Sequence, residues 1–166
     1  MPIQERIAKD FHQAVQHDFN ELMLGELLGT GASREVYVNR MNPNRVIKLE
    51  ETGFQNVTEH LTWAAVCDTP WAKWFARVWW ISANGRVLIM DRAFLPMRRP
   101  PMPELVPDFV ADSRECNMGV IKGRWVFCDY GYTNLLQKGL TNFQWVPQSE
   151  SSQVVRPTVV VNEWGL

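Results

Sequence analysis

The sequence predicts a single α+β domain built from short antiparallel strands and a few helices. Residues 3–23 and residues 54–66 carry apolar side chains at spacings of three and four, which is the pattern of amphipathic helices. Several shorter segments alternate between apolar and polar side chains and end at turn residues, as strands do. With 166 residues, 46% of them hydrophobic, the chain is long enough to bury one sizeable core.

The first strands follow the N-terminal helix, which we expect to pack on the body of the fold. An apolar run over residues 24–28 leads into Gly29-Thr30-Gly31, and residues 35–40 alternate in polarity. The turn residues Asn42-Pro43-Asn44 then precede a return strand over residues 45–50. These segments predict antiparallel strands joined by tight turns.

The helix over residues 54–66 separates these strands from two more. Residues 76–82 and 86–91 are predicted strands joined at Ala83-Asn84-Gly85, which is a hairpin signal. Residues 95–107 contain five prolines, and proline fits neither a helix interior nor a central strand because it lacks a backbone donor. We therefore predict an extended connector there.

The C-terminal part is predicted to contain a short helix or turn over residues 108–111 and then a hairpin. The strands of this hairpin cover residues 120–122 and 124–128, with the turn at Lys122-Gly123. A β-branched run over residues 154–161 predicts a final strand.

Net charge, apolar runs and cysteine spacing argue against several kinds of partner and location. The formal net charge of −1 gives no argument for nucleic acid or for an anionic membrane surface as a partner. No stretch approaches the roughly 20 apolar residues of a membrane span. The three cysteines lack paired metal-site spacing and indicate a reduced, cytoplasmic protein. The eight tryptophans predict either an aromatic core or an adhesive surface.

The hairpin around Gly29 and Gly31 is the first candidate site. Glycine lets the backbone approach a ligand closely, so the amides at such a tip can face phosphate oxygens. Ser33 and Val36 follow on the returning strand. An ordinary glycine-containing hairpin explains the same residues without a ligand.

Two charged residues on apolar elements form the second candidate. Lys48 lies within the apolar strand Val46-Ile47-Lys48-Leu49, where a buried cation needs a partner. Glu59, in the middle of the following helix, is the best partner. Otherwise Lys48 faces solvent and Glu59 is a surface residue of the helix.

Two polar loops complete the set. Asp112 and Asn117 are five residues apart, and Asp129-Tyr130-Gly131 ends an apolar strand, where a carboxylate is well placed for a metal ion. The alternatives are a turn-capping aspartate and a strand that ends in an Asp-x-Gly turn.

In this order, the motifs resemble the phosphate-handling parts of protein kinases. The chain is similar to a minimal member of the protein-kinase-like superfamily, and the resemblance covers residues 24–134. It implies one domain over residues 1–166. Its parts would be an N-terminal helix (1–23), an N-lobe with a five-stranded antiparallel sheet, a helix and a hinge (24–93), and a strongly reduced C-lobe (94–166).

The resemblance also implies roles for the motif residues, with ATP and Mg²⁺ as cofactors. Asp112 and Lys48 would be catalytic, and Asn117 and Asp129 would bind the metal. The nucleotide would be bound by Gly29, Gly31, Ser33, Val36, Lys48, Glu59, Met90, Asp91 and Ala93. Met90 is equally explained as a core residue.

The chain departs from the kinase pattern in four places. Arg34 stands where the third glycine of the loop is expected, and Val110-Ala111 replaces the His-Arg before the catalytic aspartate. About twenty proline-rich residues separate the hinge from Asp112, which leaves no room for two long helices. Only 35 residues follow Gly131, too few for a helical lower lobe.

Three functions remain open at this point. The first is an ATP- and Mg²⁺-dependent phosphotransferase that acts on a Ser/Thr hydroxyl of a protein substrate. The second is a catalytically inactive, pseudokinase-type binding module that engages or inhibits a partner protein, or forms a homodimer. The third is a small α+β domain whose motif matches are accidental.

Overall fold

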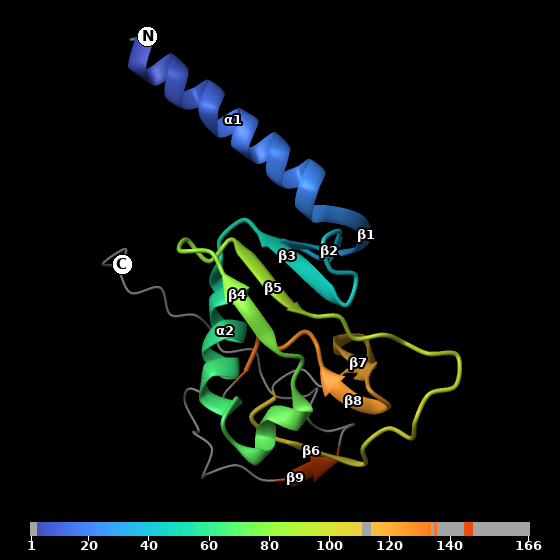
Figure 1. The fold of residues 1–166 in the computed structure, drawn as a ribbon. Coiled ribbons are helices and arrows are strands. Elements are labelled where there is room, and N and C mark those ends of the chain that lie inside the picture. The colour runs from blue at the N-terminus through green and yellow to red at the C-terminus, as the bar shows by residue number, and fades with distance from the viewer. Residues whose placement is uncertain (1–2, 111–113, 134, 136–144, 148–166) are drawn as a thin grey trace.

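The computed structural model describes residues 3–110, 114–133, 135 and 145–147, and it confirms the α+β class. Five antiparallel strands form the main sheet in the order β1-β2-β3-β5-β4, and two smaller two-stranded sheets lie below it (Figure 1). The helices and strands are α1 (Ile3–Met23), β1 (Leu24–Thr30), β2 (Arg34–Asn39), β3 (Arg45–Glu50), α2 (Phe54–Val66), β4 (Val78–Ile81), β5 (Val87–Asp91), β6 (Leu105–Pro107), β7 (Met118–Ile121), β8 (Arg124–Phe127) and β9 (Trp145–Pro147), with short 3₁₀ turns at Pro70–Trp74 and Glu115–Asn117.

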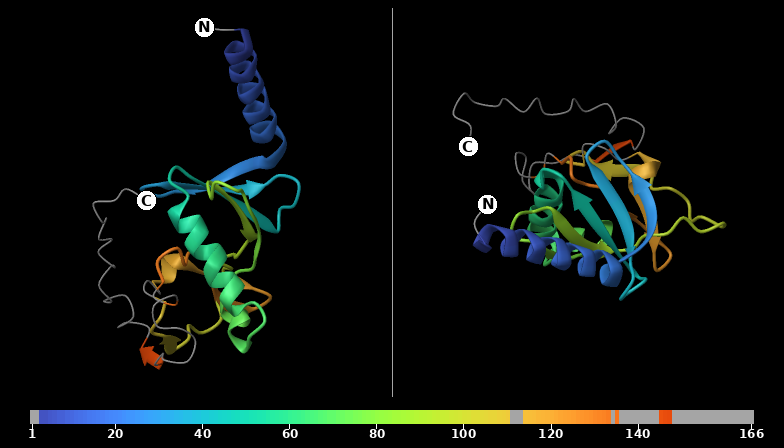
Figure 2. Two further views of the ribbon diagram at one scale, coloured as in Figure 1. Left: turned by 90° about the vertical axis from the view of Figure 1, so that its left-hand side faces the viewer. Right: turned by 90° about the horizontal axis from the view of Figure 1, so that it is seen from above.

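Helix α2 lies against the main sheet and contacts β3, β4 and β5 (Figure 2). The carboxylate of Glu50 caps its first turn, since Oε1 accepts a hydrogen bond from Gln55 N at 2.9 Å and Oε2 accepts one from Asn56 N at 2.8 Å. Gly53 before the helix has φ = 79°, and a Cβ there would come within 2.8 Å of the Asn84 carbonyl oxygen. The last residue of β3 therefore fixes the start of α2, and the close contact at Gly53 holds the helix against the β4–β5 turn.

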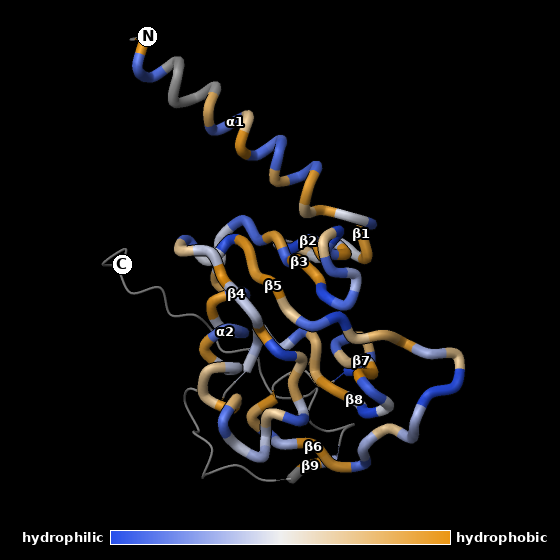
Figure 3. Tube along the Cα trace, viewed as in Figure 1, coloured by the Kyte–Doolittle hydropathy of each residue, from blue (hydrophilic) through white to orange (hydrophobic). Residues whose placement is uncertain are grey.

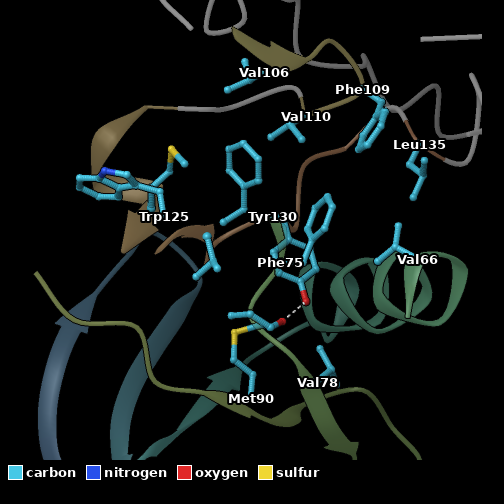
Figure 4. Packing of buried hydrophobic residues seen from close by; sticks show 14 of the residues in the cluster. Val66, Phe75, Val78, Met90, Val106, Phe109, Val110, Trp125, Tyr130 and Leu135 are labelled. Carbon is cyan, nitrogen blue, oxygen red and sulfur yellow. Dashed lines mark hydrogen bonds between the residues drawn. The ribbon is translucent and has the colours of Figure 1, made fainter. Parts of the chain in front are cut away.

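The hydrophobic core joins the main sheet to the lower part of the molecule (Figure 4). Phe75 is at its centre and contacts the rings of Phe109, Phe127 and Tyr130, with centroids 5.1–6.2 Å away. Tyr130 is fully enclosed, and its hydroxyl donates to the Ala76 carbonyl at 2.7 Å, so no buried donor is left unpaired there. The loop after β8 is therefore anchored in the core.

The expected packing of the N-terminal helix on the body of the fold is wrong. Helix α1 extends away from the sheet, and its chief contact is with β1, into which it runs without a loop (Figures 1 and 3). Arg40 N donates to the Met23 carbonyl at 2.9 Å and secures this junction. Because β1 is an edge strand, the chain enters from the rim of the sheet, and Phe11, Val15 and Leu22 stay exposed.

The proline-rich connector is largely irregular, as predicted, but it ends in the short strand β6. This strand pairs with β9, which the sequence did not predict. Strands β7 and β8 form the predicted hairpin, and its turn residues Lys122 and Gly123 both have positive φ, at 51° and 75°. The predicted strand over residues 154–161 lies outside the described residues. In the part of the chain that is described, no helix has the length and apolar character to cross a bilayer.

Candidate functional site

A buried ion pair joins strand β3 to helix α2. Lys48 is 3% exposed and Glu59 is 0% exposed. Lys48 Nζ donates to Oε1 and Oε2 of Glu59 at 2.7 and 2.9 Å, and to the Cys128 carbonyl at 2.7 Å. The predicted pairing of Lys48 with Glu59 is therefore present. An ammonium group has three donors, and a third contact to the chain after β8 ties the pair to the loop that carries Asp129.

The loop after β8 closes over this pair. Tyr130 N donates to Glu59 Oε1 at 3.1 Å, and Asp129 N donates to the Asn117 carbonyl at 3.1 Å. The Asp129 side chain is 46% exposed, in contrast to Lys48 and Glu59. One carboxylate of the site is therefore open to a ligand, while the other is fully enclosed.

Arg34 adds a second cation that the sequence analysis had treated only as a missing glycine. It comes from the start of β2 and is 7% exposed. Its Nη2 pairs with Asp129 Oδ1, and its Nη1 lies 3.2 Å from Glu59 Oε1. The site thus contains two cations and two carboxylates in contact. A signal was available in the sequence, because an arginine next to a glycine-rich tip is suited to phosphate.

The charges influence one another through their pKa values. Burial would raise the pKa of the Asp129 carboxyl, but the charges of Lys48 and Arg34 outweigh it and hold this pKa below its ordinary value. Burial would lower the pKa of the Arg34 guanidinium, but the charges of Glu59 and Asp129 outweigh this effect and hold the pKa above its ordinary value. Both groups are therefore ionised at neutral pH. Burial raises the pKa of the neighbouring Cys128 thiol to about 11, which keeps it protonated.

The hairpin between β1 and β2 has open space around its glycines. A Cβ at Gly29 would meet no heavy atom within 4 Å, and one at Gly31 would only touch the Arg34 carbonyl oxygen at 3.5 Å. The protein's own packing therefore does not require glycine at either position. Ser33 at the tip accepts a hydrogen bond from Gln55 Nε2 at 3.1 Å, which connects the tip to α2. A cavity of about 490 Å³, lined by residues 30–35, 49–51 and 86–87, opens beside the tip.

The backbone N–H groups just after β5 differ in whether a described group accepts from them. The N–H groups of Asp91, Arg92 and Phe94 donate to carbonyls of neighbouring segments, whereas the N–H of Ala93 donates to no described group. Met90 is fully buried within the hydrophobic core, and Val36 packs against that core from β2. An adenine edge needs such a free backbone donor beside apolar walls.

The metal-binding prediction concerns Asn117 and Asp129. Their backbones are hydrogen-bonded to each other, so the two residues are neighbours. One carboxylate and one amide oxygen fit Mg²⁺, which takes a few protein oxygens and completes its shell with water and phosphate. Among the described residues there is no group of three or more His, Cys, Asp and Glu side chains that could hold a metal without phosphate. A metal ion at Asp129 would have to share its carboxylate with Arg34.

The structure thus brings together Lys48, Glu59 and Asp129 from separate segments and adds Arg34. The predicted catalytic residue Asp112 lies outside the described residues. Comparison with family models, with curated proteins and with solved structures found no match for this chain. The function must therefore be argued from the geometry of the site.

Proposed function

We propose that the protein is a minimal kinase-like phosphotransferase that binds ATP and Mg²⁺ and transfers the γ-phosphate to a hydroxyl group. The buried pair of Lys48 and Glu59 is the observation that carries this proposal. In protein kinases, a lysine on the third strand and a glutamate on the adjacent helix pair in the same way, beside a metal-binding aspartate. On this proposal, Asp129 takes the part of that aspartate, because it follows Cys128, whose carbonyl accepts from Lys48 at 2.7 Å.

The surroundings of this pair support a nucleotide. The hairpin carrying Gly29 and Gly31 leaves space for phosphate oxygens, and its backbone amides can bind them. The free N–H of Ala93 suits the adenine edge. On this proposal, the five-stranded sheet with α2 corresponds to a kinase N-lobe and the segment after β5 to its hinge.

The chemistry of phosphoryl transfer asks mainly for positioning and for neutralisation of charge. On this proposal, Lys48 turns one of the donors that it now gives to Glu59 and Cys128 toward the phosphates, and Asp112 orients the attacking hydroxyl group. Magnesium, when bound by Asn117 and Asp129, neutralises the charge of the phosphate oxygens. The acceptor that we propose is a hydroxyl group on a protein substrate.

Transfer of labelled γ-phosphate from Mg-ATP tests the proposal. Wild-type protein should transfer phosphate to itself or to a generic protein substrate, and Asp129→Ala should lose this activity. Asp68→Ala is the matched control, because Asp68 is an exposed residue beyond the end of α2 and remote from the site in sequence. Full transfer by Asp129→Ala would show that the assignment is wrong.

Binding is measured separately by thermal unfolding with and without Mg-ATP. A ligand that binds only the folded state stabilises it by about 2.7 kcal/mol at a hundred times its dissociation constant. Stabilisation without phosphate transfer would indicate a nucleotide-binding protein that is not a kinase. The absence of any stabilisation would contradict a nucleotide site.

A second candidate function is the binding of a protein partner without catalysis, and helix α1 favours it. The helix extends from the body (Figure 3). Its apolar side chains Ile3, Phe11, Val15 and Leu22 are exposed. A partner that binds this surface should remain bound to Lys48→Ala and should be lost from the double variant Phe11→Ser/Val15→Ser. Loss of the partner in both variants would contradict this function.

A further inference from the structure

Arg34 lies between a cavity and the charged cluster, which is a position from which a side chain can bind a ligand. It leaves the tip of the β1–β2 hairpin, where Gly31 N donates to the Arg34 carbonyl at 2.7 Å and holds its backbone in a tight turn. Its side chain runs inward to Glu59 and Asp129. It also lines the cavity beside the tip, so it belongs both to that cavity and to the charged cluster.

One nitrogen of this guanidinium has no hydrogen bond. Nη1 is buried and lies 3.2 Å from Glu59 Oε1, yet it has no described acceptor in hydrogen-bonding geometry. Buried donors are nearly always paired, because an unpaired one costs its full desolvation. A new acceptor for Nη1 would cost its ion-pair contact with Glu59 but no hydrogen bond of Nη1, and the planar guanidinium would shift as one unit.

The new acceptor must be an anion with several oxygens. Glu59 already accepts from Lys48 and Tyr130, and Asp129 is held by Nη2. Of the two cations of the site, Lys48 already donates to three oxygens, so Arg34 is the one with a donor to offer to an added phosphate. An arginine presents its donors as a rigid fork that matches phosphate oxygens.

We propose that Arg34 binds a phosphate of the nucleotide directly and bridges it to Asp129, so that ATP binds to this protein without a divalent cation. This inference rests on the proposed nucleotide site. Arg34 then stands between carboxylate and phosphate, in the place where a metal ion would neutralise both. Magnesium at Asp129 is needed for transfer and not for binding.

The test is isothermal titration with ATP in EDTA and, separately, with ATP and excess Mg²⁺. Wild-type protein should bind ATP in both buffers. Arg34→Gln should bind ATP in EDTA about tenfold or more weakly, because a charge-assisted contact is lost, and should recover most of its affinity with Mg²⁺. Arg34→Lys keeps the charge and should fall between the two. Arg124→Gln is the matched control, since Arg124 is an exposed arginine of β8 that lies outside this cavity and outside the charged cluster.

Equal affinity of wild type and Arg34→Gln for ATP in EDTA would overturn the inference, as would wild-type binding that appears only with Mg²⁺. In either case the proposed nucleotide site would stand. Failure of wild type to bind ATP in both buffers would overturn the proposed function as well. If Arg34→Gln does not fold, Arg34→Lys decides, because it keeps the charge but loses the fork: weaker binding of ATP in EDTA than wild type supports the inference, and equal affinity overturns it.

Discussion

Replacing Glu59 by glutamine should strongly destabilise the protein, although the two side chains have the same shape. Glu59 accepts from Lys48 at 2.7 and 2.9 Å and from Tyr130 N at 3.1 Å, and it lies 3.2 Å from an Arg34 nitrogen. The glutamine amide keeps one acceptor oxygen, but its NH₂ group is a donor and would face the donors of Lys48 and Tyr130. The change therefore leaves two buried cations with one carboxylate, that of Asp129.

The magnitude follows from the burial of both partners. Breaking a buried ion pair by removing one partner costs about 3–5 kcal/mol, because the remaining charge stays buried without compensation. Lys48 is 3% exposed and Glu59 is 0% exposed, so this range applies without the discount for solvent screening. In a domain of this length, such a loss lowers Tm by roughly 6–20 °C. The loss of about 3–5 kcal/mol is a large part of the total free energy of unfolding, which is about 5–15 kcal/mol in typical domains.

Urea denaturation followed by tryptophan fluorescence measures this loss. The double variant Lys48→Met/Glu59→Gln removes the excess charge, so it should be less destabilised than the sum of the two single variants by about 0.5–3 kcal/mol. Glu51→Gln is the control for the loss of one surface carboxylate and should change stability by less than about 0.5 kcal/mol. A loss below about 1 kcal/mol in Glu59→Gln would refute the buried pair.

Three further predictions concern other parts of the site. The pKa of Asp129 is lowered by folding, so its contribution to stability is complete above about pH 4 and is lost as the pH falls through the folded-state value. The difference in unfolding free energy between wild type and Asp129→Asn should therefore shrink below pH 4, and a constant difference would contradict the shift. Cys116 is exposed and should react with iodoacetamide at pH 8, whereas Cys128, with a pKa of about 11, should be unreactive until the protein unfolds; mass spectrometry of the labelled peptides checks this. Gly119→Ala would place a Cβ 2.6 Å from the Ala93 Cβ and should destabilise the protein by about 1–3 kcal/mol, as measured by urea denaturation; unchanged stability would show that the two segments are not in contact.

The strands of the main sheet and the two long helices were predictable because their signals are local. Alternation over residues 35–40 and the helical spacing over residues 54–66 depend only on neighbours in the chain. The same holds for the turn at Lys122-Gly123, whose residues tolerate positive φ. Strand β9 was missed because only its pairing with β6, some forty residues earlier, makes it a strand.

The role of Arg34 could not be predicted from spacing. Its contact with Asp129 spans 95 positions of the chain and depends on how the hairpin lies over the loop after β8. The direction of α1 was likewise hidden, because an amphipathic pattern shows that a helix has an apolar face and says nothing about what covers it.

By itself, the sequence determined the α+β class, the order of the main-sheet strands along the chain and three of the charged residues that meet in the site, namely Lys48, Glu59 and Asp129. Local periodicity and turn chemistry suffice for these, since they act over a few residues. Only the tertiary structure decided that Lys48 and Glu59 meet in the interior, that Asp129 stays half-exposed, and that Arg34 joins them. Burial and charge pairing arise when distant segments exclude water together, and no local pattern records which segments those are.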